Sequence, residues 1–334
     1  FYGLVGFRGT LDWRESEQDG FSRGENASIS EAFGYFRNLW LDGFDVQVGR
    51  QDFDEPREWL YDQNMDALRA IYTRGLYRAE LSASTNFSDA SQRDENSENL
   101  IAYVTRDVSD RTLGLYVIDR RDDREPNDYP IYFGARALGE WLPDAEIWAE
   151  YSLLRGYKGT TDLESYAYDL GLTWSGSVID PYYLTMGWAF GSGDGDPSDD
   201  VDEAFHQTGL NDNNGKFGGV TSFRYYGEII DPELTNLGVL TLGVGRRFGR
   251  RNSLDLVWHQ YAQDIAADRI VNSNLKGRPT GADTDLGWEL DLILGNRAWS
   301  GVDLELVLGT FEPGDAFAQN DAAWLLGLQA RFRL

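Results

Sequence analysis

The amino-acid sequence predicts an all-β fold, a transmembrane antiparallel up-and-down β-barrel, and three observations carry this prediction. Apolar and polar residues alternate along most of the chain with a period close to two, as on strands with one apolar face. The alternating segments are about 9 to 14 residues long, which suits a tilted strand that crosses a bilayer. The connections alternate between tight turns and longer polar loops, as in barrels of the outer membrane.

The alternation is clearest in residues 182–190, where Leu184 and Met186 share one parity while Thr185 and Gly187 share the other. Such a pattern places one set of side chains on each face of a strand. Counting these segments predicts about sixteen strands. They lie near residues 1–13, 28–41, 44–53, 66–74, 76–87, 99–107, 112–121, 130–141, 145–156, 163–175, 181–192, 238–248, 253–263, 285–296, 301–311 and 322–334.

The connections divide into two classes that would lie at opposite ends of the strands. Tight turns are predicted near Leu41–Phe44, Arg74–Leu76, Pro143–Asp144, Gly176–Asp180, Gly249–Ser253 and Arg297–Gly301. Longer loops are predicted near 14–27, 54–65, 88–98, 122–129, 157–162, 193–237, 264–284 and 312–321. Short turns are typical of the periplasmic side and long loops of the outer side. We therefore expect a single barrel domain over residues 1–334, with 193–237 as its longest outer loop.

The composition excludes several classes of protein. A formal net charge of −26 argues against nucleic acid as a partner, because phosphate binding needs a basic surface. The absence of cysteine excludes a disulfide framework, a thiolate metal site and a cysteine nucleophile. The two histidines, His206 and His259, have neither the spacing for a zinc site nor the partners for a hydrolytic triad. We expect no enzyme. A soluble sandwich or propeller is the alternative fold, but the Leu-, Trp- and Tyr-rich outward stripe favours a barrel.

If the apolar parity faces lipid, the other parity faces the lumen, and it carries many charged residues. Three interpretations of the lumen arginines stay open. They face a wall of carboxylates and create a transverse field, as in many diffusion porins; they form a ladder for a polyanion; or they pair with lumen acids and stiffen the barrel. Arg50 has the outward parity, so it reaches the lumen only if Gly49 forms a bulge, and otherwise it lies at the outer rim. The candidate pore-lining residues are Arg8, Arg50, Arg69, Arg78, Arg120, Arg136, Arg247 and Arg331.

An acidic loop at residues 191–203 offers one candidate metal site. Asp194, Asp196 and Asp199 carry the carboxylate oxygens that Ca²⁺ prefers. The alternative is a solvated acidic outer loop without a specific ion. No other cofactor is expected.

Four segments resemble the alginate export family of outer-membrane porins. The most specific is residues 205–237, FHQTGLNDNNGKFGGVTSFRYYGEIIDPELTNL. VGRQDF at 48–53 and REWLYDQNMDALRAIY at 57–72 are similar to the family's segment that joins an arginine-bearing strand to the next. FEPGDAF at 311–317 resembles its last outer loop.

This resemblance implies a monomeric barrel of eighteen strands that exports alginate, an acidic uronic-acid polysaccharide, through an arginine-lined constriction. With about sixteen strands visible, two alternatives stay open: a further N-terminal hairpin lies before Phe1, or this member of the family is smaller. The resemblance carries Arg50 and Arg69 over as pore residues, whereas Arg8, Arg136 and Arg247 rest on parity alone.

The sequence therefore predicts a channel in the outer membrane of a Gram-negative bacterium, through which an anionic exopolysaccharide passes passively. A general diffusion porin for small ions or solutes is the alternative, and a barrel that docks a partner is a third class. Expected partners are the polysaccharide, outer-membrane lipid with lipopolysaccharide, and a periplasmic export scaffold.

Overall fold

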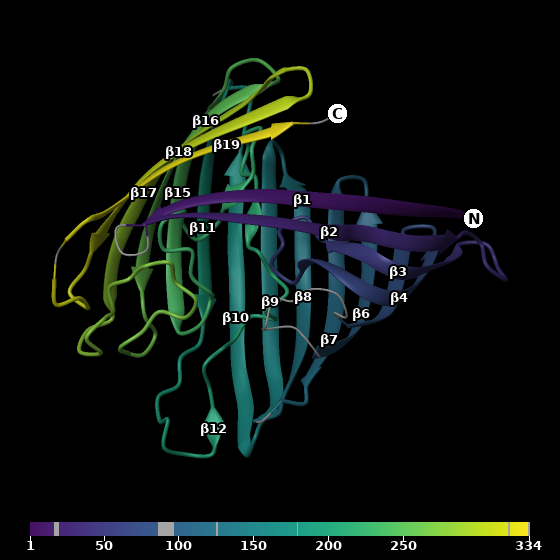
Figure 1. Ribbon diagram of the computed structural model, residues 1–334, viewed down its shortest axis with the longest axis horizontal. Helices are drawn as coiled ribbons and strands as arrows, with labels where there is room; N and C mark the ends of the chain where they lie inside the picture. Colours follow the sequence, from purple (N-terminus) through teal and green to yellow (C-terminus); the bar gives the residue numbers. More distant parts are fainter. Residues whose placement is uncertain (17–19, 86–96, 125, 179, 320, 333–334) are drawn as a thin grey trace.

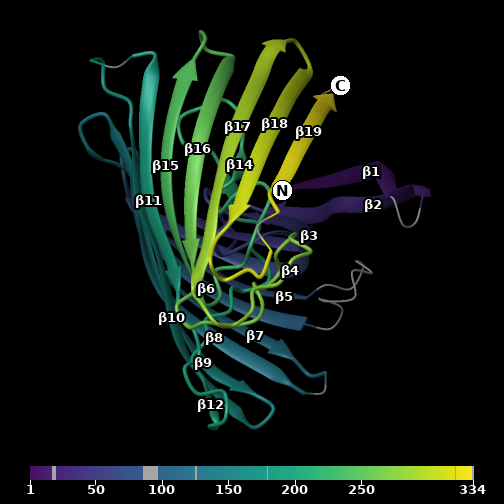
Figure 2. The same cartoon turned by 90° about the vertical axis from the view of Figure 1, so that its left-hand side faces the viewer.

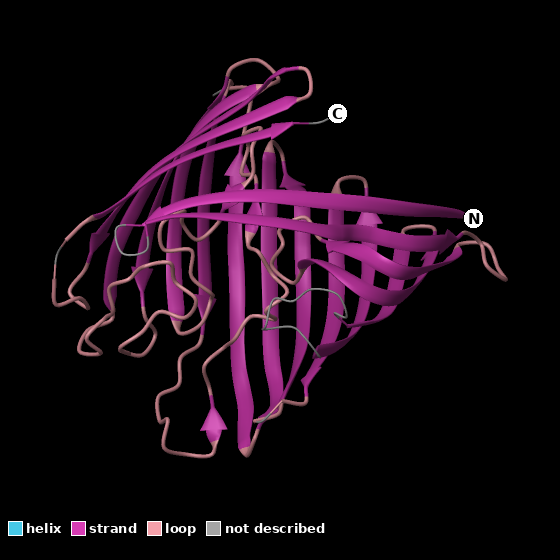
Figure 3. Cartoon of the chain, viewed as in Figure 1, coloured by secondary structure: helices cyan, strands magenta, loops and turns pink. Residues whose placement is uncertain are grey.

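The protein, described here from a computed structural model, is built of strands and loops (Figure 3). The structure describes residues 1–16, 20–85, 97–124, 126–178, 180–319 and 321–332, except for the side chains of residues 8–28. Among the described residues, no helix is long and apolar enough to cross a membrane.

The described residues form a 17-stranded sheet that curves into a barrel wall (Figures 1 and 2). Sixteen of its strands build the wall, because β12 is only two residues long. The wall strands are β1 (Tyr2–Ser16), β2 (Gly20–Phe36), β3 (Phe44–Asp54), β4 (Asp62–Arg74), β5 (Tyr77–Thr85), β6 (Ser97–Val108), β7 (Arg111–Asp122), β8 (Asp128–Leu142), β9 (Ala145–Lys158), β10 (Thr161–Trp174), β11 (Tyr182–Gly191), β15 (Leu237–Arg247), β16 (Asn252–Ala262), β17 (Asp285–Trp299), β18 (Val302–Pro313) and β19 (Ala323–Phe332).

Each wall strand pairs antiparallel with the next wall strand in the chain, which gives up-and-down topology. Between β11 and β15 the chain leaves the wall and forms the short strands β12 (Val201–Asp202), β13 (Asn214–Gly215) and β14 (Phe223–Arg224). β1 and β19 are the two edges of the sheet, and no ladder joins them in the part of the chain that is described. The predicted all-β, up-and-down fold is confirmed.

The outer face of the wall is apolar. Along β11, Leu184, Met186 and Trp188 are 44%, 54% and 40% exposed, while Thr185 and Gly187 between them are buried. An arginine at mid-membrane on such a face would cost about 2–4 kcal/mol, so the membrane selects this sorting of side chains. The inner face carries the charged residues and packs against connecting segments that fold into the barrel (Figure 2).

Three predicted boundaries were wrong. The second strand was expected at 28–41 after a loop at 14–27, but β1 and β2 continue through that polar region as one long hairpin. The loop expected at 157–162 is a two-residue turn, with Gly159 at φ +59°. The turn expected near Leu41–Phe44 spans residues 37–43. Polar residues at the ends of long strands resemble loops in sequence, because no apolar face marks them beyond the membrane.

Candidate functional site: the filled interior of the barrel

Two connecting segments fill the barrel interior. The short inserted segment is residues 55–61, between β3 and β4. The long inserted segment is residues 192–236, between β11 and β15. They meet at aromatic contacts, because the rings of Trp59 and Phe205 stack with centroids 6.3 Å apart. The indole of Trp59 also donates to the Tyr226 hydroxyl at 2.9 Å. The interior therefore has a packed core rather than an open lumen.

Arg136 is the most buried of the candidate pore residues. It lies on β8, is 3% exposed, and faces Glu150 on β9 across the ladder. Its Nε donates to Glu150 Oε1 at 2.8 Å, and its Nη1 lies 2.8 Å from Glu55 Oε2. One guanidinium thus joins the wall to the short inserted segment through two carboxylates.

Glu55 is the residue that fixes the short inserted segment. Its carboxylate accepts the backbone N–H groups of Arg57, Trp59 and Leu60, at 3.1, 2.5 and 2.9 Å. Burial by itself would raise the pKa of the Glu55 carboxyl, but the Arg136 guanidinium and these backbone donors hold it below its usual range. Glu55 therefore remains an anion inside the barrel.

Arg57 makes a second bridge to the wall. Its Nη2 lies 2.6 Å from Asp169 Oδ2 on β10, and its guanidinium stacks over the Trp148 and Tyr225 rings at 4.4 and 4.0 Å. Asp169 also accepts the Trp148 indole N–H at 2.7 Å and the Tyr226 hydroxyl at 3.1 Å. The sequence-based analysis missed Glu55 and Arg57, because it treated residues 54–65 as an outer loop. The sequence did contain an indication of this buried contact: Glu55 and Arg57 flank Pro56, and the large apolar side chain of Trp59 follows them.

Arg69 and Arg78 share one acid on the inner wall. Arg69 Nε lies 2.5 Å from Glu80 Oε1, and Arg78 Nη2 lies 2.7 Å from Glu80 Oε2. Arg69 also lies over the Phe53 ring at 4.3 Å. Two guanidinium groups on one carboxylate leave this part of the wall locally positive.

Arg120 and Arg247 bind the long inserted segment through its backbone. Arg120 Nη1 donates to the Thr208 carbonyl at 2.5 Å, and Arg247 Nε donates to the Gly218 carbonyl at 2.7 Å. Arg120 also borders a cavity, so part of its guanidinium faces open space. Both residues are on the inner parity of their strands.

The other three candidate arginines have different positions. Arg50 bonds to Asp66 at 3.2 Å and to the Ile29 carbonyl at 3.0 Å. Asp66 is paired with Thr85 across the β4–β5 ladder and lies on the same face of β4 as Leu68, which is exposed on the outer side of the wall. The Arg50–Asp66 pair therefore lies on the outer face of the sheet, and Arg50 does not line the interior. The β3–β4 register has no shift at Gly49, although its φ is +119°.

Arg331 is exposed on the inner parity of β19 and borders a cavity. The side chain of Arg8 is outside the described residues.

Carboxylates on the opposite wall hold the long inserted segment. Glu289 on β17 accepts the backbone N–H groups of Ile229 and Ile230, at 2.6 and 3.1 Å. Asp291 accepts the N–H of Glu228 at 3.3 Å. Wall arginines thus bind carbonyl groups of this segment, and wall acids bind its N–H groups, so its backbone is anchored from both sides.

Three cavities remain around the inserted segments. The largest, of about 1110 Å³, is bordered by Arg120, Arg124, Tyr132 and the long inserted segment. A second, of about 1030 Å³, lies between the inserted segments and the inner face of β18 and β19. A third, of about 600 Å³, adjoins the largest cavity near the end of β9. These are the spaces in which a ligand could contact the interior.

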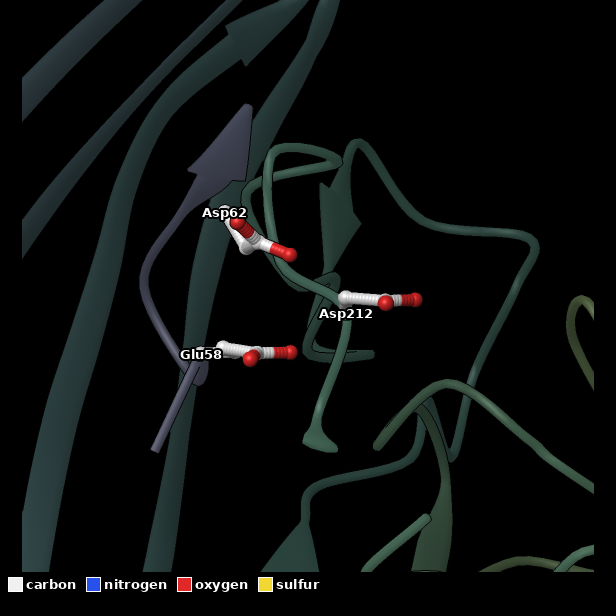
Figure 4. A group of neighbouring side chains, drawn as sticks. All are labelled: Glu58, Asp62 and Asp212. Carbon is white, nitrogen blue, oxygen red and sulfur yellow. The ribbon is translucent and has the colours of Figure 1, made fainter. Parts of the chain in front are cut away.

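The acidic residues expected to bind Ca²⁺ make hydrogen bonds within their own loop. The carboxylates of Asp194, Asp196 and Asp199 accept the backbone N–H groups of residues two positions later, at 3.0, 3.2 and 2.9 Å. In the described chain, the three carboxylates that come together are instead those of Glu58, Asp62 and Asp212, with ligand atoms within 4.8 Å of one another (Figure 4). Burial, together with the charges of Asp62 and Asp212, raises the pKa of Glu58 to about 8.

Solved structures with a similar fold include OprD, an outer membrane protein, and two proteins named OccK. OccK5 (OpdH) of Pseudomonas aeruginosa has a TM-score of 0.62 at 11% identity, over 99% of this chain and 88% of that one. OccK11 (OpdR) of the same organism has a TM-score of 0.58 at 16% identity, over 93% and 83%. OprD, also from P. aeruginosa, has a TM-score of 0.58 at 9% identity, over 93% and 79%. At these identities the likeness concerns the fold.

Two curated relatives are similar in sequence. The alginate production protein AlgE of P. aeruginosa is 30% identical over 175 residues, which cover 48% of this chain and 35% of that protein. AlgE of Azotobacter vinelandii is 33% identical over 141 residues, covering 40% and 28%. The chain thus spans about a third of the length of each curated relative that it matches.

The family model described as alginate export matches residues 16–325, which is most of the chain. The match includes both inserted segments and the inner-wall arginines Arg69, Arg78, Arg120, Arg136 and Arg247. This outer-membrane β-barrel protein belongs to the alginate export family.

Proposed function

We propose that the protein is an outer-membrane channel through which an anionic exopolysaccharide such as alginate passes passively. Membership of the alginate export family and similarity to two alginate production proteins support the substrate class. The barrel fold supports passage rather than catalysis, so we propose no enzymatic step. We expect the channel to act as a monomer, in contact with lipopolysaccharide and with a periplasmic export scaffold.

The contact between Arg136 and Glu55 is the observation that carries this proposal. Glu55 presents a carboxylate to one edge of a guanidinium whose other edge is held by Glu150. A uronate offers the same chemical group, and arginine binds carboxylates with matched geometry. Movement of the short inserted segment would free that edge of Arg136 for a substrate carboxylate.

Exchange of one carboxylate for another keeps the buried arginine paired at each stage. Leaving it unpaired would carry the large desolvation cost of an isolated buried charge. Several such weak contacts in series let a chain advance, whereas one tight site would hold it. The second bridge, between Arg57 and Asp169, would work in the same way.

The test is single-channel conductance in planar bilayers, with oligomannuronate added to one side. We expect the oligomer to block the current reversibly, and we expect Arg120→Gln to weaken the block, because Arg120 borders the largest cavity. Arg106→Gln is the matched control, since Arg106 is exposed, lies on the parity of the apolar outer face and carries the same charge.

A conducting barrel that ignores the oligomer would remove the proposal and favour the general diffusion porin. A folded barrel that conducts nothing, with or without the oligomer, would favour a docking role.

A further inference from the structure

The 600 Å³ cavity at the outer end of the barrel is lined by basic residues. Its described lining includes Lys158, His206, Arg269, Lys276 and Arg278, and it includes no acidic residue. This is unexpected in a chain with 56 acidic and 30 basic residues. A gathering of one sign of charge around a concave surface concentrates the local field.

Three of these cations have no acidic partner. In the described part of the chain, Arg269, Lys276 and Arg278 make no ion pair, and all three are exposed. The other two are partly neutralised, since Lys158 Nζ lies 3.1 Å from Asp128 and His206 Nε2 lies 3.5 Å from Asp202. The cavity thus differs from the inner wall, where Arg69, Arg78 and Arg136 are paired with carboxylates.

The loop that carries the three cations is fixed to the long inserted segment. The Glu233 N–H donates to the Val271 carbonyl at 3.1 Å, and the Asn274 N–H donates to the Ile230 carbonyl at 2.9 Å. Gln263 Nε2 also donates to the Arg269 carbonyl at 2.9 Å. A loop held in this way loses little freedom when a ligand binds, which favours affinity.

The basic cavity continues toward the interior. It shares Lys158, His206 and Asn272 with the 1110 Å³ cavity, which reaches Arg120 on the inner wall. The larger cavity also contains acids, among them Asp122, Asp231 and Glu233, so the purely basic lining is confined to the outer cavity. The second large cavity, beside β18 and β19, also includes acids in its lining, among them Glu58, Asp62 and Glu305.

We propose that the basic cavity is a binding site for the carboxylate groups of an anionic saccharide at the outer mouth of the channel. The inference rests on the proposed function and adds to it a site outside the barrel interior. A net charge of −26 repels a polyanion, so a chain that leaves along this surface needs local cations. Exposed cations bind weakly and are screened by salt, which suits release.

The experiment measures binding of oligomannuronate to refolded, lipopolysaccharide-free protein in detergent, by isothermal titration calorimetry at two salt concentrations. The variant is Arg269→Ala/Lys276→Ala/Arg278→Ala. We expect it to weaken binding at least about tenfold at low salt, since three charge-assisted contacts are lost. At high salt, the difference in affinity between the variant and the wild type should become smaller, because salt screens the exposed cations.

The matched control removes three cations at the opposite end of the strands, as Arg74→Ala/Arg250→Ala/Arg251→Ala. It changes the net charge by the same amount and should bind within about twofold of the wild type, because distant surface charges are screened. Maltohexaose, a neutral oligomer, should bind none of the proteins through this site.

The outcomes separate the two proposals. Equal binding of oligomannuronate by the wild type and the Arg269/Lys276/Arg278 variant would overturn the mouth site while leaving the channel proposal standing. Equal weakening in both triple variants would also overturn it, because the effect would then be one of net charge. If the oligomer neither bound to nor blocked the wild-type channel, the proposed function itself would fail.

Discussion

Arg136 and Glu150 face each other across the β8–β9 ladder inside the barrel, with Arg136 Nε 2.8 Å from Glu150 Oε1. Both side chains are fully buried, and a second carboxylate, that of Glu55, lies 2.8 Å from Arg136 Nη1. A buried cation between two buried anions depends on all three, because removal of one leaves charge without a partner.

Replacing Arg136 with methionine should therefore destabilise the barrel strongly. Loss of one partner of a buried ion pair costs about 3–5 kcal/mol, because the remaining charge stays desolvated. Arg136→Met/Glu150→Gln should recover part of this loss, since only one carboxylate is then left. The measurement is guanidinium-induced unfolding in detergent micelles, followed by tryptophan fluorescence.

Arg121→Met is the surface control for this experiment. Arg121 pairs with Asp119 at 2.9 Å while 62% of its side chain is exposed, so solvent already screens the pair. Comparable destabilisation by Arg121→Met and Arg136→Met would argue against the special position of Arg136.

Glu55→Gln should loosen the short inserted segment without unfolding the wall. The amide keeps one acceptor for the N–H groups of Arg57, Trp59 and Leu60, but it loses the charge that binds Arg136. We expect faster hydrogen exchange over residues 57–61 by about tenfold, which corresponds to about 1.4 kcal/mol of lost local stability.

Channel current should rise in the same variant, because a loosened segment blocks the interior less. The control is Glu203→Gln, since Glu203 is exposed and its backbone carbonyl, not its side chain, accepts the Ser192 hydroxyl. Unchanged exchange over residues 57–61 in Glu55→Gln would mean that other contacts anchor the segment.

The sequence predicted the wall well because the membrane imposes a simple rule on it. Strand β11 alternates without interruption, β17 alternates between Gly287 and Gly295, and Glu289 and Asp291 lie on the inner parity as expected. The interior was not predictable in this way. Contacts such as Arg57 with Asp169 join residues 112 positions apart, and no periodicity connects a loop to the wall it meets.

The positions of the arginines illustrate the same limit. Parity indicates that Arg69, Arg78 and Arg136 point inward, but it does not indicate that Glu80, Glu150 and Glu55 already hold them. The three cations of the basic cavity that make no ion pair in the described chain were not predicted, because they lie on a loop in which apolar and polar residues do not alternate. Their signal was the cluster of Arg269, Lys276 and Arg278 within an otherwise acidic chain.

Gly49→Ala tests the backbone at the strand that carries Arg50. Gly49 has φ +119°, and an added Cβ would lie 2.3 Å from the Ala32 carbonyl oxygen on β2. A non-glycine residue held in such a conformation costs about 1–3 kcal/mol before the steric clash is counted. We expect a lower denaturation midpoint and poorer refolding, measured by the heat-modifiable shift on gels.

The matched substitution is Gly195→Ala, in the acidic outer loop. An added Cβ at Gly195 meets nothing within 4 Å, so the midpoint should stay close to that of the wild type. If Gly49→Ala also left the midpoint unchanged, the strand would have an alternative conformation at this position.

Glu58 should make the packing of the short inserted segment depend on pH. Burial and the neighbouring Asp62 and Asp212 raise its pKa to about 8 from the usual 4.5, so the folded protein favours the protonated carboxyl. The folded state then binds more protons than the unfolded state between these values, and stability falls as the pH rises through this window. Below about pH 4.5 both states are protonated and the effect is constant.

Glu58→Gln keeps the shape of the protonated side chain and removes its titration. The melting temperature of the variant should therefore rise relative to that of the wild type as the pH increases from 5 to 9. Because Glu58 is partly exposed, solvent screening makes this change smaller than full burial would. The control is Glu98→Gln, because Glu98 is exposed on the outer face of β6. The difference in melting temperature between this variant and the wild type should not change with pH over the same range. A flat difference for Glu58→Gln as well would mean that Glu58 is ionised in the folded barrel at neutral pH, and that the three carboxylates are separated or neutralised by a bound cation.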